Sequence, residues 1–437
     1  MDAMAWIALA VFLVTIGVVI ANVIDASVAA LVGVAVMVWL GVMTEVDAFG
    51  YVDWNVMAIL VSIWIIAGYF GKTGLPGWLS VQALRASGGH PGLLVMILSV
   101  LAGMISMFVD NVVTILMMAP VALPLARALK LPATPVILMI GFSANFMGTA
   151  LLLGDLPPQM LHSVSGAEFM DFIWQFGRPS SFPILMVTFA ITLGAMYVYG
   201  FRGTRRVTTR LADLGVESRI PDPLFAAIVM GWFLITVVGM AFREVLDVKL
   251  GFIALTGALL LVLMLELAGK RLKAPSFEDI VQELDWRAIL FYIALFALVG
   301  GLEKVRILEH LAEALKPLFL ENLALGATLL YWVTVPVVGI VEHDAFILTF
   351  LYTIRDLGND GVATWPLWWM LVWSGTLGSN LTVAGPALYV ALNIAEKEEG
   401  RKVSLREFLS WSIPFTLVAA GVCYALGMLI WVLPYMK

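Results

Sequence analysis

The feature that most constrains this chain is a series of apolar segments long enough to cross a membrane. A helix of about 20 residues spans the roughly 30 Å hydrocarbon core of a bilayer. The chain is 62% apolar and only 13% charged, whereas a soluble domain has about 25% charged residues. We therefore predict an all-α polytopic membrane protein with about 10–12 membrane segments. Full-length segments lie at residues 4–24, 26–43, 54–71, 181–200, 223–241, 250–267, 286–302 and 408–432.

Four further apolar segments are interrupted by polar residues or glycine. They cover residues 92–129, 134–154, 323–354 and 365–394. Irregular backbone at membrane depth is tolerated only where protein or a water-filled cavity covers it. We therefore expect these breaks to face a binding site.

The first break contains the sequence FVDNVVTILMMAP, residues 108–120. A charged side chain at membrane depth costs from about 3 to more than 10 kcal/mol unless it is paired, hydrated or neutralised. Asp110, Asn111 and Thr114 offer carboxylate, amide and hydroxyl oxygens, which suit Na⁺ or a proton. A half-helix that begins near Asn111 would instead favour an anion, and Asp110 could serve only as a helix N-cap. We predict that Asp110 is the cation and proton site.

The chain repeats this pattern 232 residues later. Asp53 and Trp54 open one apolar segment, and Asp285 and Trp286 open another at that offset. The same offset from Asp110 leads to a cluster of three ionisable residues, Glu342, His343 and Asp344. Such a cluster suits a proton relay because burial shifts carboxylate titration toward that of histidine. The alternative is a short exposed turn between two apolar segments.

The other two breaks also correspond, at an offset near 231. One contains Asn145, Thr149 and Gly154, and the other contains Asn380 and Thr382. The amides and hydroxyls offer ligands, and small residues allow close backbone approach. The alternative is ordinary packing between membrane helices. For Asp155, which two prolines follow closely, helix termination is the first interpretation and a gate the second.

Lysine and arginine concentrate in three loops, residues 201–220, 268–285 and 395–407. The positive-inside rule places these loops in the cytoplasm. If residues 92–129 and 323–354 form re-entrant hairpins, both termini lie outside and the halves are inverted. We predict a first half at 1–200, with a hairpin around 110 and a broken helix around 148. A cytoplasmic linker at 201–221 leads to a second half at 222–437, with equivalents around 342 and 380.

Several classes of protein are disfavoured. The single cysteine, Cys423, excludes a disulfide framework. The four histidines are scattered without the spacing of a zinc enzyme, and we expect neither an enzyme nor a cofactor, apart from bound Na⁺ or H⁺. A net charge of −6 with basic residues only in short loops gives no reason to expect nucleic acid. The expected partners are a small inorganic ion and the lipid bilayer, and the expected location is the inner membrane.

Three motifs resemble the ion transporter superfamily, in the branch of arsenite permeases, D-type Na⁺/H⁺ antiporters and the pigmentation P protein. They are FVDNVVTILMMAP, ANFMGTALLLGD (144–155) and LGSNLTVAG (377–385). Citrate and divalent-anion transporters are more distant members of that superfamily. The resemblance implies a homodimer with a scaffold part, a moving part with two hairpins, and an elevator mechanism. It also implies a site at Asp110, Asn111, Thr114, Asn145, Thr149, Asn380 and Thr382.

The chain departs from the branch pattern in places. Glu342, His343 and Asp344 replace the usual Asp-Asn of the second hairpin, and Met147 and Leu151 replace a glycine and a threonine. We predict a proton-coupled secondary transporter of the Na⁺/H⁺ antiporter type. The first alternative is efflux of an inorganic oxyanion or arsenite. A sodium- or proton-coupled dicarboxylate or citrate transporter comes third, and a passive ion channel is the alternative from another class.

Overall fold

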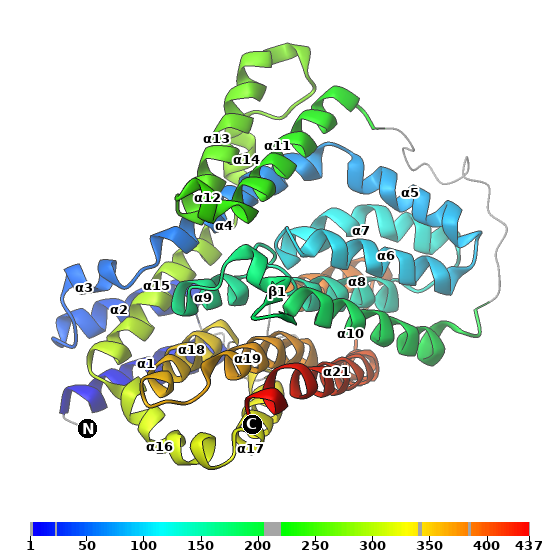
Figure 1. The fold of residues 1–437 in the computed structure, drawn as a ribbon. Coiled ribbons are helices and arrows are strands. Elements are labelled where there is room, and N and C mark those ends of the chain that lie inside the picture. Colours follow the sequence, from blue (N-terminus) through cyan, green and yellow to red (C-terminus); the bar gives the residue numbers. More distant parts are fainter. Residues whose placement is uncertain (1–2, 22–23, 205–219, 340–342, 383–385, 437) are drawn as a thin grey trace.

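The computed structural model describes residues 3–21, 24–204, 220–339, 343–382 and 386–436, and these form helices almost throughout (Figure 1). The strands there are β1 (Trp174–Gln175) and β2 (Arg178–Pro179), which pair antiparallel. The first half contains α1 (Ala3–Ala21), α2 (Ala26–Trp39), α3 (Glu45–Gly50), α4 (Trp54–Lys72), α5 (Leu75–Ser87), α6 (Pro91–Ser106), α7 (Asn111–Ala128), α8 (Ala133–Met147), α9 (Leu156–Ser165) and α10 (Ser181–Met196), which a π-helical turn extends to Phe201.

The second half is also helical. It contains α11 (Pro223–Ala241), α12 (Arg243–Leu246), α13 (Leu250–Ala268), α14 (Phe277–Glu283), α15 (Trp286–Lys304), α16 (Ile307–Glu321), α17 (Leu323–Val338), α18 (His343–Asn359), α19 (Thr364–Gly378), α20 (Pro386–Glu399) and α21 (Leu405–Gly427). Short π and 3₁₀ turns extend α21 to Tyr435.

Eight of these helices are long and apolar enough to cross a membrane, which confirms the prediction of a polytopic membrane protein. Seven match predicted segments, and the eighth is α7. The predicted span at 26–43 is wrong in length. Helix α2 ends at Trp39, because Gly41 has a φ of +74° and turns the chain toward α3.

The helices of the two halves follow one another in the same order at an offset of about 232 residues. Helix α4 begins at Trp54 and α15 begins at Trp286, and Asp53 and Asp285 cap their first turns. The two short helices that precede them, α3 and α14, each begin with a capping box. The indole of Trp54 donates to the carbonyl of Phe49 at 3.2 Å, and the indole of Trp286 donates in the same way to Val281 at 3.0 Å.

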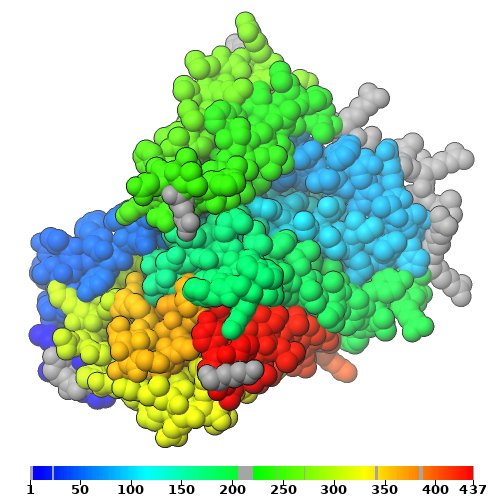
Figure 2. Space-filling view, viewed as in Figure 1, coloured from blue at the N-terminus to red at the C-terminus, as the bar shows by residue number. Residues whose placement is uncertain are grey.

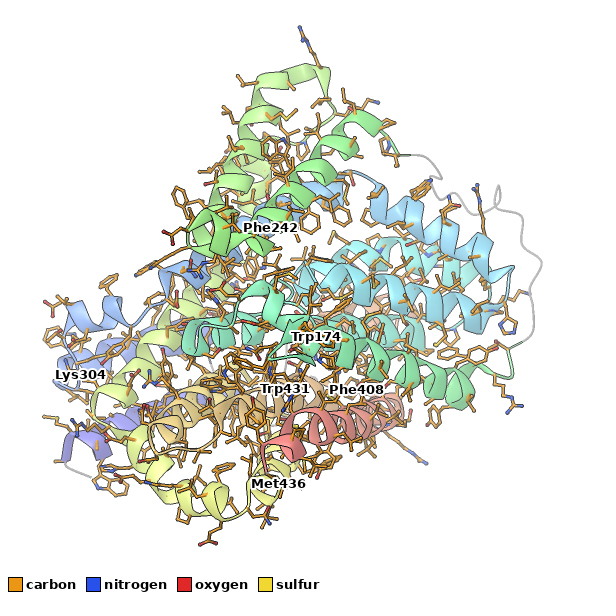
Figure 3. All side chains as sticks on the ribbon, in the orientation of Figure 1. Trp174, Phe242, Lys304, Phe408, Trp431 and Met436 are labelled. Carbon is orange, nitrogen blue, oxygen red and sulfur yellow. The ribbon has the colours of Figure 1, made fainter. Side chains whose placement is uncertain are left out.

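Helices α4 and α15 run in opposite directions. Lys304, at the end of α15 (labelled in Figure 3), pairs with Asp47 of α3, directly before α4 begins. Lys72, at the end of α4, pairs with Glu283 of α14 at 2.6 Å, directly before α15 begins. An inverted repeat requires this antiparallel relation. The division at 1–200, 201–221 and 222–437 stays a prediction.

The halves are packed crosswise. Helix α13 of the second half packs on α4, and α2 of the first half packs on α15. Near the centre, α20 lies against α7 and α8, whereas α9 lies against α18 and α19. Helices α11 to α13 form a lobe at the top of Figure 1, and Figure 2 shows it as a separate green projection. This exchange of elements brings the breaks of both halves together.

Aromatic side chains fix the region around α19. Trp369 donates to the side chain of Gln175 at 3.1 Å, and Trp431 donates to the carbonyl of Pro179 at 3.0 Å. The β hairpin therefore ties α19 to the end of the chain, and Figure 3 shows Trp174 and Trp431 in this central region.

Candidate functional site

The tip of the first hairpin lies between α6 and α7. Asp110 caps α7 there, and its Oδ1 accepts hydrogen bonds from the amides of Val112 at 2.9 Å and Val113 at 3.2 Å. The residue is only 9% exposed. Asp110 is therefore a helix cap, and it is also a carboxylate that faces a cavity. Its second oxygen, Oδ2, takes no part in the cap.

Asn145 links the breaks of the two halves. Its Oδ1 accepts a hydrogen bond from Asn111 at 3.0 Å. Its Nδ2 donates to Ser379 at 2.7 Å and to the side chain of Asn380 at 3.1 Å. A second donor bond from Asn111 reaches Asp155 at 3.2 Å. One buried network thus joins the first hairpin tip to both broken helices.

The predicted threonines lie beside this network. The hydroxyls of Thr149 and Thr376 are 2.5 Å apart, so the breaks meet at a second point. The hydroxyl of Thr114 donates to the carbonyl of Val109 at 3.3 Å, and that of Thr382 donates to Gly339. These hydroxyls are used in holding the backbone around the site.

The start of α18 brings His343 and Asp344 to the same region. Both are buried, with 8% and 3% exposure, and His343 Nε2 lies 3.2 Å from Asp344 Oδ1. These two residues therefore do not form an exposed turn. Glu342, the third predicted member of this cluster, lies outside the described residues.

A cavity of about 760 Å³ leads to these residues. Its inner end is lined by Asp110, Asn111, Asn145, Asp155, His343 and Ser379. Its other end is lined by Lys72 and Glu283, whose side chains are 44% and 55% exposed. The cavity therefore opens where α4 ends and α15 begins. Thr114, Thr149, Asn380 and Thr382 do not line it, although they were predicted as ligands.

The inner end of the cavity is acidic. Asp110 and Asp155 line it, and Asp344 lies directly beside His343, which also lines it. Among the described lining residues, Lys72 is the one lysine or arginine, and it is paired with Glu283 at the mouth. No group of three or more His, Cys, Asp or Glu in the described chain has the geometry of a metal centre. The site can hold a proton or a small cation more readily than a free anion.

The sequence analysis underestimated Asp155. It does not terminate the preceding helix, because α8 ends at Met147, and it instead caps the start of α9, where its Oδ1 accepts from the amide of Leu156 at 2.9 Å. Its other oxygen joins the central network through Asn111. Ser379 and Thr376 were missed altogether. Their position before Asn380 in a Gly-containing break was the available signal.

A helical membrane fold in which helix ends from both halves of the chain bring buried polar side chains to one cavity is that of a membrane secondary transporter. The chain belongs to the citrate transporter family, CitMHS, whose profile matches residues 10–374. This confirms the resemblance to the ion transporter superfamily, and the family lies among the members that we placed at a greater distance. The family and its relatives are transporters, so the expectation that the chain is not an enzyme is confirmed.

The chain is similar to several proteins along most of its length. It is 27% identical to a 46 kDa membrane protein of Mycobacterium leprae over 98% of both chains. It is 23% identical to an uncharacterized transporter of Synechocystis over 95% of both. The human P protein is 22% identical to it in an alignment that covers 86% of this chain and 54% of the P protein.

The fold also resembles a solved structure. MtrF of Neisseria gonorrhoeae, described as one of a class of antimetabolite efflux pumps, superposes with a TM-score of 0.58 at 12% identity. The match covers 89% of this chain and 83% of MtrF. At that identity the likeness concerns the fold alone.

Proposed function

We propose that this protein is a proton-coupled cation transporter, most directly a Na⁺/H⁺ antiporter that works by alternating access. The observation that carries the proposal is the acidic inner end of the cavity. Asp110 and Asp155 line it, and the described lining residues place no lysine or arginine there. A small cation or a proton neutralises such a site, whereas an anion would add to the repulsion.

Coupling follows from the cost of a buried charge. An ionised carboxylate at membrane depth is unfavourable, so Asp110 is stable when protonated or when paired with a cation. Arrival of one of these therefore favours release of the other, which is exchange. Asn111, Thr114, Asn145, Thr149, Asn380 and Thr382 would bind or position the ion. Glu342, His343 and Asp344 would return the proton.

We further propose an elevator movement of the hairpins and broken helices against a scaffold, in a homodimer of the inner membrane with both termini outside. Arg271 and Lys273 directly precede α14, and Glu283 of α14 lines the mouth of the cavity, so the cavity would open to the cytoplasm. The opposite directions of α4 and α15 support the inverted relation of the two halves on which this proposal depends.

The family match favours a second candidate, transport of citrate. Free citrate carries several negative charges at neutral pH. The carboxylates of Asp110 and Asp155 would repel it unless a cation entered with it. Such a carboxylate would therefore travel together with protons or with a bound cation.

The test uses purified protein in proteoliposomes with a fluorescent pH indicator inside. Addition of Na⁺, Li⁺ or K⁺ on one side should dissipate a preset pH gradient with the wild type and not with Asp110→Asn. Asp222→Asn is the matched control, because Asp222 caps α11 through two amides in the same way, is only half-buried and does not line the cavity. That variant should keep the activity. If no cation moves protons but labelled citrate enters the vesicles, the antiporter proposal fails and the second candidate replaces it.

A further inference from the structure

We infer that the cation site includes Gln159, to which the sequence analysis assigned no role, and that this residue completes a small ion pocket with Asp110 and Asp155. This inference rests on the proposed function and names the ligands of the ion. Gln159 is 1% exposed, and its Oε1 finds no hydrogen-bond donor among the described residues. A buried carbonyl without a partner is unfavourable and is typical of a site for an absent ligand.

The pocket is a narrow space next to the main cavity, and in this conformation it is too small to hold a water molecule. Asp110, Asp155 and Gln159 line it together with Gly154. Asp110 and Asp155 also line the main cavity, so the two spaces share their acidic wall. An ion that entered from the main cavity would reach the pocket at these two carboxylates.

The helical geometry of α9 explains how Gln159 reaches this position. Asp155 caps α9, and Gln159 follows four residues later, so the two side chains lie on one face of the helix. Two carboxylates and a neutral carbonyl form the set of hard oxygen ligands that a small cation accepts.

The opposite wall of the pocket determines how much water the bound ion can keep. Leu60, Ile63 and Trp64 of α4 close the pocket on its other side. These mainly apolar side chains would not stabilise water molecules that remained bound to the ion. The pocket therefore suits a small monovalent cation that has lost most of its water, Na⁺ or Li⁺, and disfavours the larger K⁺.

The experiment measures the Na⁺ concentration that gives half the maximal proton movement in proteoliposomes. Gln159→Leu should raise this concentration about tenfold or more, because one ligand to a charged group is lost. Gln159→Glu keeps an oxygen and adds charge, so it should lower the half-saturating concentration at alkaline pH. Li⁺ should respond as Na⁺ does.

The control is Gln175→Leu. Gln175 is also buried, but its Oε1 accepts a hydrogen bond from Trp369 far from the pocket, so its loss tests packing alone. If the wild type moves protons and both Gln159 variants keep the wild-type half-saturating concentration, Gln159 is no ligand and this inference fails alone. If the wild type moves no protons with any cation, the proposed function itself fails.

A second observation concerns the residues that correspond, through the repeat, to the lining of the open cavity, and we call their side of the protein the closed face. We propose that Arg355 and Glu303, with Tyr51 and Tyr352, form a latch that seals this face. The Arg355 guanidinium bonds to Glu303 at 2.9 Å and lies 4.7 Å from the ring centre of Tyr352. Tyr51 packs directly on Gly300, where an added Cβ would lie 2.1 Å from its ring.

The repeat shows what the latch replaces. At the offset of 232, Gly300, Glu303 and Tyr352 correspond to Gly68, Gly71 and Pro120, and all three of these line the open cavity. Arg355 corresponds to Leu123, so the open face has no equivalent ion pair. The same space is thus hollow on one face and filled on the other. For an ion to enter from the closed face, the latch must break. This inference rests on the alternating access proposed above.

Cysteine labelling tests the latch in a Cys423→Ala background, since Cys423 is the single cysteine. Met117 lines the open cavity, and Thr349 is its equivalent behind the latch. A water-soluble maleimide should label Met117→Cys quickly and Thr349→Cys slowly in detergent. Arg355→Gln should then raise the labelling rate of Thr349→Cys several-fold.

Lys316→Gln is the matched control, because Lys316 forms an ion pair of similar exposure with Asp360 outside the latch. It should leave the labelling of Thr349→Cys unchanged. The latch is refuted if Thr349→Cys labels as fast as Met117→Cys before any latch residue is altered. It is equally refuted if Arg355→Gln leaves the rate unchanged while the folded protein elutes normally.

Discussion

At the scale of single residues, the central fact is that one amide joins the two halves. Asn145 uses both ends of its side chain, as acceptor for Asn111 and as donor to Ser379 and Asn380. A buried polar network is stable only when its members are satisfied. The site is therefore rigid at Asn145 and has spare ligands at Asp110 and Gln159.

Replacement of Asn145 should damage both stability and transport. Asn145→Ala removes one hydrogen bond each from Asn111, Ser379 and Asn380 and leaves the side-chain oxygen of Asn380 without its donor. A buried group left unsatisfied costs about 1–3 kcal/mol. We expect a lower unfolding temperature in detergent and loss of cation-driven proton movement. Asn55→Ala, at the surface end of α4, is the comparison for loss of an amide away from the site. Normal transport by Asn145→Ala would show that the network is not part of the site.

A charge at the membrane surface gives a pH-dependent stability. The Lys304 ammonium and the Thr44 hydroxyl hold the pKa of Asp47 below its ordinary 3.8. A carboxyl group with a lowered folded-state pKa stabilises the protein above its ordinary pKa, and this contribution is lost as the pH falls through the folded value.

Asp47→Asn should therefore unfold at a lower temperature than the wild type at pH 7, and the difference should shrink when the pH falls below 3.8. Tryptophan fluorescence during heating in detergent measures both values. Lys304→Gln should reproduce the loss at pH 7, because it removes the same ion pair. A difference that grows toward low pH would have the wrong sign and would contradict the assignment.

At the scale of elements, the breaks depend on the close approach of backbones. A Cβ at Gly154 would lie 2.2 Å from the carbonyl oxygen of Ser106 and 2.5 Å from that of Gly148. The first hairpin and the broken helix thus touch at this glycine. Any larger residue must push the hairpin tip away from Asp155.

Gly154→Ala should consequently lose transport and about 1–3 kcal/mol of stability, as overpacked sites do. Gly194→Ala in α10 is the control, since a Cβ there meets nothing within 4 Å. That change should be neutral or slightly stabilising. Unfolding temperature and proton movement measured on both variants decide the matter, and an active, stable Gly154→Ala protein would exclude the close contact.

Sequence reasoning located the elements better than the contacts between them. An acidic residue in an apolar run predicted a break in the helix at Asp110, because most other positions in a membrane would give that charge a high free-energy cost. The end of α2 was missed, since Gly41 acts through a local φ that no apolar pattern records. Gln159 and Ser379 were missed because their roles depend on which helices meet, and packing decides that.

At the scale of the whole molecule, the halves are held together by exchanged elements. Helix α20 packs on α7 and α8, α9 packs on α18 and α19, and α13 packs on α4. Two ion pairs also join the first half to the second, Lys72 with Glu283 and Lys304 with Asp47. Each half leaves apolar faces that the other half covers, so neither half buries its core alone.

A chain cut between residues 204 and 220 should therefore reassemble. The two fragments, expressed together with a tag on only one, should copurify and restore cation-driven proton movement in proteoliposomes. Each fragment expressed alone should be degraded or inactive, because its exchanged helices lack their partners. Addition of Gly154→Ala to the first fragment should abolish the restored movement, which ties activity to the assembled site. Fragments that fail to copurify would show that the predicted linker at 201–221 is more than a connection between two halves.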